Sequence, residues 1–128
     1  MMKPNEISDV IVDAAMKVHS ALGPGLLESA YEACLRHELV KRGLKCECQV
    51  ALPVVYDGEV VDLGYRIDLM VADTVIVELK AVAALMPIHE AQTISYLRLS
   101  GRPIGLLINF HVPHLKDGIR RFVNNLGT

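Results

Sequence analysis

The sequence predicts one α/β domain in which helices flank a central mixed β-sheet. Apolar residues recur at helical spacing in residues 7–22 and 27–39, and two runs rich in β-branched residues meet at a short polar break at 72–74. Another apolar run, residues 104–108, follows a third helical segment, and a strand that returns through a helix pairs in parallel. We therefore expect a three-strand antiparallel meander plus one parallel strand, with helices packed against the sheet.

The composition limits the class of protein. The 128 residues suffice for a single domain spanning 1–128, and a hydrophobic content of 52% supports a buried core. No apolar run approaches the ~20 residues of a membrane span, and the first ten residues contain no apolar signal core. We therefore expect a cytoplasmic protein without membrane association. The small size favours a homodimer or a protein partner.

Charge and cysteine content narrow the expected partners. The net charge of −2 and the pI near 6.2 argue against binding to nucleic acid by bulk charge. Basic residues late in the chain usually form a solvated face, but they would supply phosphate contacts if the fold gathered them beside the 72–74 break. These residues are Arg98, Arg102, Lys116, Arg120 and Arg121. The three cysteines, an odd number, favour free thiols.

The first two helices are separated by a Gly-Pro-Gly break. Asn5 or Ser8 is expected to cap the first helix, and residues 23–25 end it. The second helix should begin near Leu26 and run to about Arg42, with the following glycine as its C-terminal cap. Both helices carry an apolar stripe, so each should pack one face inward.

Three strands should follow as the antiparallel meander. The first runs from about Lys45 to Val55, and Pro53 indicates an edge position because proline cannot donate to the ladder. The Asp-Gly pair at 57–58 is typical of a hairpin turn. This turn leads into the strand that contains Asp68.

The remaining elements are a helix, a strand and a short helix. Pro87 suits the first position of a helix, and Ser100 and Gly101 should end it. Residues 103–110 are predicted to form the parallel strand. A basic helix from about 115 to 125 is expected to close the chain, with its apolar residues facing inward. These apolar residues are Ile119, Phe122, Val123 and Leu126.

The register of the central hairpin decides which polar residues meet. If residues 72–74 form a three-residue loop, Val71 faces Val75, and counting back places Asp68 directly across from Glu78. Directly opposed side chains have Cβ atoms ~4.5–5.5 Å apart. Lys80 lies on the same face as Glu78, because side chains alternate along a strand. A two-residue loop would instead turn Glu78 to the other face.

Two neighbouring carboxylates are unfavourable unless one is protonated or a cation bridges them. Carboxylate oxygens suit Mg²⁺ or Mn²⁺. A lysine beside such a metal can orient a water molecule and stabilise developing negative charge. In the alternative interpretation, Lys80 balances Glu78 in a cross-strand ion pair and Asp68 is solvated.

A second motif lies at the start of the second helix. Glu28 is in its first turn, where a carboxylate ordinarily favours the positive end of the helix dipole. Residues 25–31, GLLESAY, resemble the signature of the GxxExxY protein family. Asp68 followed by Glu78-Leu79-Lys80 resembles the PD-(D/E)XK nuclease superfamily, of which GxxExxY proteins look like a compact branch. The segments YRIDLMV, VIVELKA, AQTISYL and GLLINF follow in the same order, so the resemblance covers about residues 10–122.

This resemblance implies a restriction-endonuclease-like core and metal-dependent hydrolysis of phosphodiester bonds, with DNA preferred over RNA. By the same resemblance, Asp68, Glu78 and the backbone carbonyl of Leu79 would bind Mg²⁺ or Mn²⁺. Glu28 would bind the metal directly or through water. Lys80 would position the attacking water and stabilise the charge of the phosphorane.

Gln92 and Tyr96 lie four residues apart and so share one face of the third helix. They would form a polar rim on an ordinary core helix. Their spacing also resembles a pattern of the RecB-type branch of the superfamily, which implies that Gln92 contacts the substrate backbone or supports Lys80 and that Tyr96 shapes the site. Two other functions stay open: a non-catalytic nucleic-acid-binding or protein-interaction module that retains the fold and metal site, and a structural domain.

Overall fold

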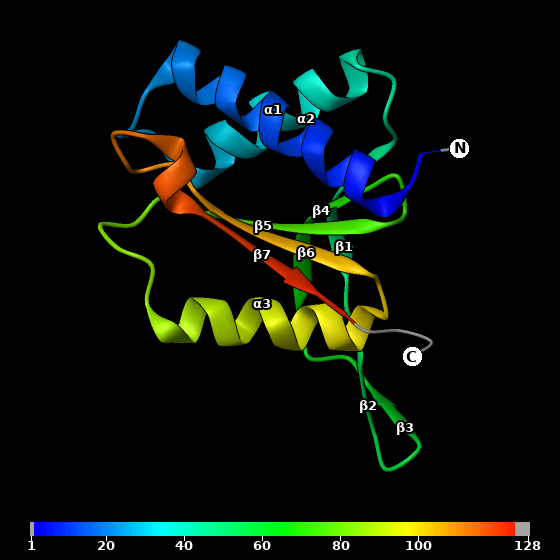
Figure 1. Cartoon of the computed structure of the whole chain (residues 1–128). Coiled ribbons are helices and arrows are strands. Elements are labelled where there is room, and N and C mark those ends of the chain that lie inside the picture. The colour runs from blue at the N-terminus through cyan, green and yellow to red at the C-terminus, as the bar shows by residue number, and fades with distance from the viewer. Residues whose placement is uncertain (1, 125–128) are drawn as a thin grey trace.

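The computed structural model describes residues 2–124, which form three helices, a short 3₁₀ turn and seven strands (Figure 1). The elements are, in order, α1 (Pro4–Leu22), α2 (Glu28–Lys41), β1 (Cys46–Ala51), β2 (Val54–Tyr56), β3 (Glu59–Val61), β4 (Arg66–Val71), β5 (Val75–Lys80), α3 (Pro87–Ser100), β6 (Ile104–Asn109), η1 (Leu115–Gly118) and β7 (Ile119–Val123). No helix in these residues is long and apolar enough to cross a membrane.

Five strands form one mixed sheet in the order β1-β4-β5-β6-β7. Strands β1, β4 and β5 form the predicted antiparallel meander, and β6 pairs with β5 in parallel through the α3 crossover. Strand β1 is an edge strand of the sheet, as predicted from Pro53 for the strand at 45–55. The predicted α/β fold with a mixed sheet is therefore confirmed, and the sheet gains one strand, β7, that the sequence analysis did not anticipate.

The predicted C-terminal helix is wrong. Residues 115–118 form η1, and residues 119–123 form β7, which pairs antiparallel with β6. Ile119 and Phe122 pack into different cores on opposite faces of the sheet, as an odd spacing in a strand requires. Val123, expected to face inward, is exposed, and Leu126 lies outside the described residues.

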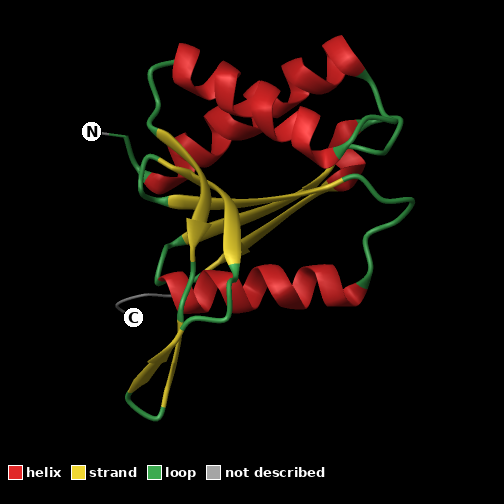
Figure 2. Cartoon of the chain, turned by 180° about the vertical axis from the view of Figure 1, so that it is seen from behind, coloured by secondary structure: helices red, strands yellow, loops and turns green. Residues whose placement is uncertain are grey.

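Helices cover both faces of the sheet (Figures 1 and 2). Helices α1 and α2 pack on one face, where Ile11, Leu35 and Val77 belong to the larger core. Helix α3 packs on the other face, where Ile76 and Leu97 belong to a smaller core. Because both faces are covered, every residue of β5 up to Leu79 is buried.

The turn between α1 and α2 is fixed by a buried tyrosine. The Tyr31 hydroxyl donates to the Gly23 carbonyl at 2.6 Å and accepts from the Leu26 N–H at 3.1 Å. The Tyr31 ring stacks on Phe110 with centroids 4.4 Å apart. The tyrosine of the 25–31 motif therefore anchors the start of α2 to the end of the parallel strand.

The N-terminal cap of α1 differs from the expectation. The helix begins at Pro4, so Asn5 and Ser8 both lie inside it. The Glu6 carboxylate accepts from the Lys3 N–H at 2.9 Å and satisfies a free donor at the helix start. Proline at the first helical position removes another such donor.

The predicted long strand at 45–55 is two strands. Strand β1 ends at Ala51, and β2 pairs only with β3 in a separate hairpin that projects from the body (Figures 1 and 2). The predicted turn at 57–58 is confirmed, with φ of 54° at Asp57 and 77° at Gly58. We call residues 54–61 the arm.

Candidate active site

The hairpin register is the one predicted from the three-residue loop. Val71 pairs with Val75 and Leu69 with Val77, and Asp73 in the loop has a φ of 53°. The pairing stops at Leu69 and Val77, one position before Asp68 and Glu78 would meet. The two acidic residues therefore lie where the β4–β5 ladder ends.

Asp68 bonds to the neighbouring strand through its side chain. Its Oδ2 accepts from the Leu79 N–H at 2.8 Å. If the ladder continued, Leu79 would lie opposite Ile67, and the backbone of β4 would accept the hydrogen bond from the Leu79 N–H. Because the ladder has ended, the Asp68 carboxylate accepts this hydrogen bond instead. This hydrogen bond holds the Asp68 carboxylate close enough to Glu78 to affect its pKa.

Glu78 is buried beside this carboxylate. The residue is only 5% exposed, and its side-chain oxygen Oε1 has no hydrogen-bond partner among the described residues. Burial and then the charge of Asp68 raise the pKa of Glu78 from 4.5 to about 9, against a smaller lowering by Lys80. At neutral pH the raised pKa favours the protonated form of the Glu78 carboxyl.

Lys80 follows on the same face of β5 and is half-buried. Within residues 2–124 it forms no ion pair with Glu78 or Asp68. The cross-strand ion pair of the structural interpretation is thus not formed. The lysine still lowers the pKa of Glu78 by its charge.

Two residues that the sequence analysis did not name complete the surroundings of Asp68. The Gln49 amide nitrogen lies 3.3 Å from Asp68 Oδ1 and 2.7 Å from Glu32 Oε1. Partial burial above all, with the charges of Asp68 and Glu28, raises the pKa of Glu32, while the hydrogen bond from Gln49 lowers it. The sequence offers one indication of Glu32: it lies four residues after Glu28, so the two side chains share one face of the second helix.

Glu28 occupies the first position of α2 and is exposed. Its charge acts on Glu32, one turn further along the helix. Among the residues that the structure describes, no three His, Cys, Asp or Glu side chains are close enough together to hold a metal ion. The structure therefore brings Asp68 and Glu78 together, and it does not add Glu28 to them as a ready third ligand.

Gln92 and Tyr96 share a face of α3, as predicted. The Gln92 amide donates to the Tyr96 hydroxyl at 3.1 Å, and the Tyr96 ring lies 5.8 Å from that of Tyr65. These three residues, with Ile88, line a shallow pocket of about 290 Å³. Helix α3 covers the sheet face to which Glu78 and Lys80 belong by alternation with Ile76.

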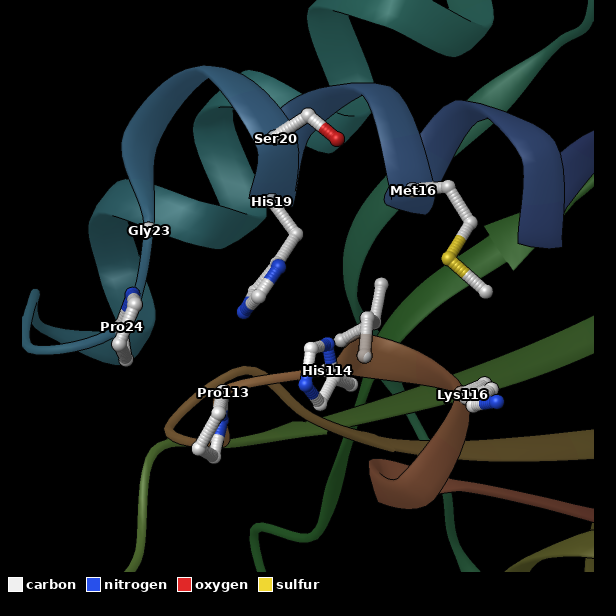
Figure 3. A pocket seen from close by; sticks show the side chains of 9 residues that line it. Met16, His19, Ser20, Gly23, Pro24, Pro113, His114 and Lys116 are labelled. Carbon is white, nitrogen blue, oxygen red and sulfur yellow. The ribbon is translucent and has the colours of Figure 1, made fainter.

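A larger surface pocket, of about 460 Å³, lies between the end of α1 and residues 113–116 (Figure 3). His19 and His114 point into it, and the His19 Nε2 lies 2.8 Å from the Val112 carbonyl oxygen. Its lining contains Lys116 and no carboxylate. None of the predicted site residues contributes to this pocket, so its size does not identify it as the active site.

The chemistry of the carboxylate pair fits a divalent cation. Glu78 Oε1 is a buried acceptor without a donor, and Asp68 adds a second carboxylate beside it. Such a pair is stable only with a proton or a cation between its members. The raised pKa of Glu78 reflects this requirement, because it favours a proton on that carboxyl at neutral pH.

The chain matches one family model, described as the PD-(D/E)XK nuclease superfamily, over residues 5–122. Neither a search of curated proteins nor a search of solved structures found a match. The narrower resemblance to the GxxExxY family stays a prediction. The carboxylate pair followed by Lys80 fits the Asp…Glu-x-Lys pattern after which the superfamily is named. The family match spans nearly the whole chain, and the chain therefore belongs to the PD-(D/E)XK nuclease superfamily.

Proposed function

We propose that this protein is a metal-dependent nuclease that hydrolyses phosphodiester bonds, with DNA preferred over RNA. The observation that carries the proposal is the carboxylate pair at the end of the β4–β5 ladder, where Asp68 is fixed by the Leu79 N–H and Glu78 Oε1 is buried without a partner. Membership of a superfamily of hydrolytic nucleases supports the reaction class.

Asp68 and Glu78 would hold Mg²⁺ or Mn²⁺, together with the backbone carbonyl of Leu79. Glu28 would contribute directly or through water after a change of its side-chain conformation. When bound, the cation supplies an acidified water molecule and neutralises charge on the phosphate. Glu78 must lose its proton to become a ligand, which ties cation affinity to pH.

The other residues act on the substrate. Lys80 follows Glu78 on the same face, and its ammonium orients the attacking water and stabilises the negative charge that develops on phosphorus oxygens. Gln92 contacts the substrate backbone or supports Lys80 from α3. Tyr96 shapes the site by its packing against Tyr65.

The basic residues are only partly placed for phosphate contacts. Arg102 pairs with Asp73 at the turn end of the hairpin, away from the carboxylates. Arg120 pairs with Leu107 in the sheet, and Leu107 pairs with Glu78, so Arg120 lies level with the site. Lys116 instead lines the pocket beside α1. We infer that Arg120 is the cation that meets a bound phosphate backbone.

A second candidate function is a non-catalytic nucleic-acid-binding or protein-interaction module. Among residues 2–124, no three His, Cys, Asp or Glu side chains lie close enough together to hold a metal ion, which favours this second function. The exposed arm, in which Tyr56 is 76% and Val60 68% exposed, supports a homodimer or a protein partner.

All three cysteines are free, which supports a cytoplasmic location.

The test is a cleavage assay on labelled single-stranded, duplex and branched DNA and on RNA, with Mg²⁺, Mn²⁺ or chelator. We expect metal-dependent cleavage by the wild type and none by Asp68→Asn or Lys80→Ala. Glu59→Gln, a change on the exposed arm, is the matched control and should cleave normally. Cleavage that survives both site variants would refute the mechanism, and binding without cleavage would favour the second function.

A further inference from the structure

A chain of three polar side chains joins α2 to the sheet. Glu32 of α2 accepts from the Gln49 amide nitrogen at 2.7 Å, and the same nitrogen lies 3.3 Å from Asp68 Oδ1. Only the nitrogen of a carboxamide can donate, so an amide between two carboxylates must present this atom to both. The orientation of the Gln49 amide thus follows from its two neighbours.

The backbone at Gln49 is in an unusual conformation for the interior of a strand. Its φ is 53°, in the left-handed region that residues other than glycine rarely adopt. Such a conformation persists only where the surroundings enforce it, and it is common at functional sites. Nothing in the ladder requires a glutamine at this place, since Gln49 and Asp68 are the one opposed pair skipped in the β1–β4 register.

At Gln49 and Asp68, both strands change the face of the sheet toward which their alternate side chains point. Cys48 and Leu69 pack against the core under α1 and α2, whereas Val50 and Ile67 pack against the core under α3. In regular strands, residues two apart would share a face. The change of face occurs at the opposed pair Gln49 and Asp68, whose side chains are hydrogen-bonded to each other. Asp68 is also the first residue of β4 beyond the end of the β4–β5 ladder.

The two oxygens of Asp68 therefore have separate partners. Oδ2 accepts from the Leu79 N–H, which is part of the sheet, and Oδ1 accepts from Gln49. One hydrogen bond leaves a carboxylate free to rotate about its terminal bond, because that torsion is broad. A second bond from another direction fixes the plane of the carboxylate.

We propose that Gln49 is a positioning residue that fixes the Asp68 carboxylate for a divalent cation, and that Glu32 holds Gln49 in place. The inference rests on the proposed function, because it concerns the cation site of that nuclease. Partners that orient a metal ligand commonly change affinity by roughly 10- to 100-fold when they are removed. Gln49 touches neither substrate nor reacting atoms in this assignment.

Mn²⁺ binding to the full chain, measured by titration calorimetry beside the melting temperature, tests the inference. Gln49→Gly removes the amide and also relieves the positive φ, so we expect about tenfold or greater loss of affinity with no fall in melting temperature. Glu47→Gln changes an exposed carboxylate on the same strand and should bind as the wild type does.

Two substitutions of Glu32 separate its hydrogen bond from its charge. Both Glu32→Gln and Glu32→Ala remove the charge, but only the glutamine keeps an oxygen that accepts from Gln49. We expect Glu32→Ala to bind Mn²⁺ several-fold more weakly than Glu32→Gln. Equal affinities would overturn the assigned role of Glu32.

The outcomes distinguish this inference from the proposed function. Binding by the wild type that is lost in Asp68→Asn would establish the site. Wild-type affinity in Gln49→Gly would then overturn the positioning role and leave the nuclease proposal intact. Absence of Mn²⁺ binding by the wild type would overturn both, and a melting temperature that falls with affinity in Gln49→Gly would make Gln49 a structural residue instead.

Discussion

Replacing Glu78 by glutamine should make the metal-free protein more stable at neutral pH and remove a pH dependence. The folded carboxyl has a pKa of about 9, against 4.5 for an exposed glutamate. Between these values the folded state holds a proton that the unfolded state has released. Stability must therefore fall as pH rises through this range, since the unfolded state binds fewer protons.

The size of the effect follows from the slope. Each pH unit between the two pKa values removes about 1.4 kcal/mol of unfolding free energy, so a rise from pH 5.5 to pH 8 removes up to about 3 kcal/mol. Glu78→Gln has no proton to lose. Its unfolding free energy should therefore exceed that of the wild type by a margin that widens with pH.

Urea denaturation of both proteins in chelator, across this pH range, measures the difference. The other titrating groups are common to both proteins, so the difference between the two curves isolates Glu78. Parallel curves would refute the assignment of a buried, protonated Glu78. Adding Mn²⁺ to the wild type at pH 8 should restore stability, because the cation replaces the proton between the carboxylates.

The remaining predictions concern the cation and the scaffold. Mn²⁺ affinity, measured by calorimetry, should rise by up to about tenfold per pH unit from pH 6 to 8 as Glu78 gives up its proton, and a flat profile would contradict this. Tyr31→Phe keeps the stacking on Phe110 but loses both hydroxyl hydrogen bonds, so urea denaturation should show a loss of about 1–3 kcal/mol. Gly118→Ala would place a Cβ 2.3 Å from the Asn109 carbonyl oxygen, and we expect a loss of at least about 2 kcal/mol or no soluble protein. A Gly118→Ala protein as stable as the wild type would show that the turn can shift.

The central hairpin was predictable because its information is local. Alternation along each run and the length of the polar break together specify the pairing of Val71 with Val75, and the register follows by counting. The same local rules fail at residues 115–123. There the apolar residues also fit a helical period, and only the open edge of β6 selects a strand.

The partners of Asp68 were not predictable by these rules. Gln49 reaches Asp68 because its backbone leaves the regular strand conformation, and a left-handed glutamine has no sequence signature. Glu32 comes from a helix on another layer, and the motif at 25–31 directs attention to Glu28 instead. Long-range geometry, rather than residue type, decides which acidic residue of α2 meets the sheet.

The fold and the site share one carboxylate, which affects the choice of inactive variant. Asp68→Ala would leave the buried Leu79 N–H without an acceptor, at about 1–3 kcal/mol. Asp68→Asn keeps an oxygen for that donor, and its amide lacks the negative charge that a cation requires. We therefore expect Asp68→Asn to lose Mn²⁺ binding and cleavage with a melting temperature near that of the wild type, whereas Asp68→Ala melts several degrees lower. Equal melting temperatures for the two variants would show that the Leu79 N–H finds another acceptor. The Asp68 carboxylate would then contribute to the cation site and not to the stability of the fold.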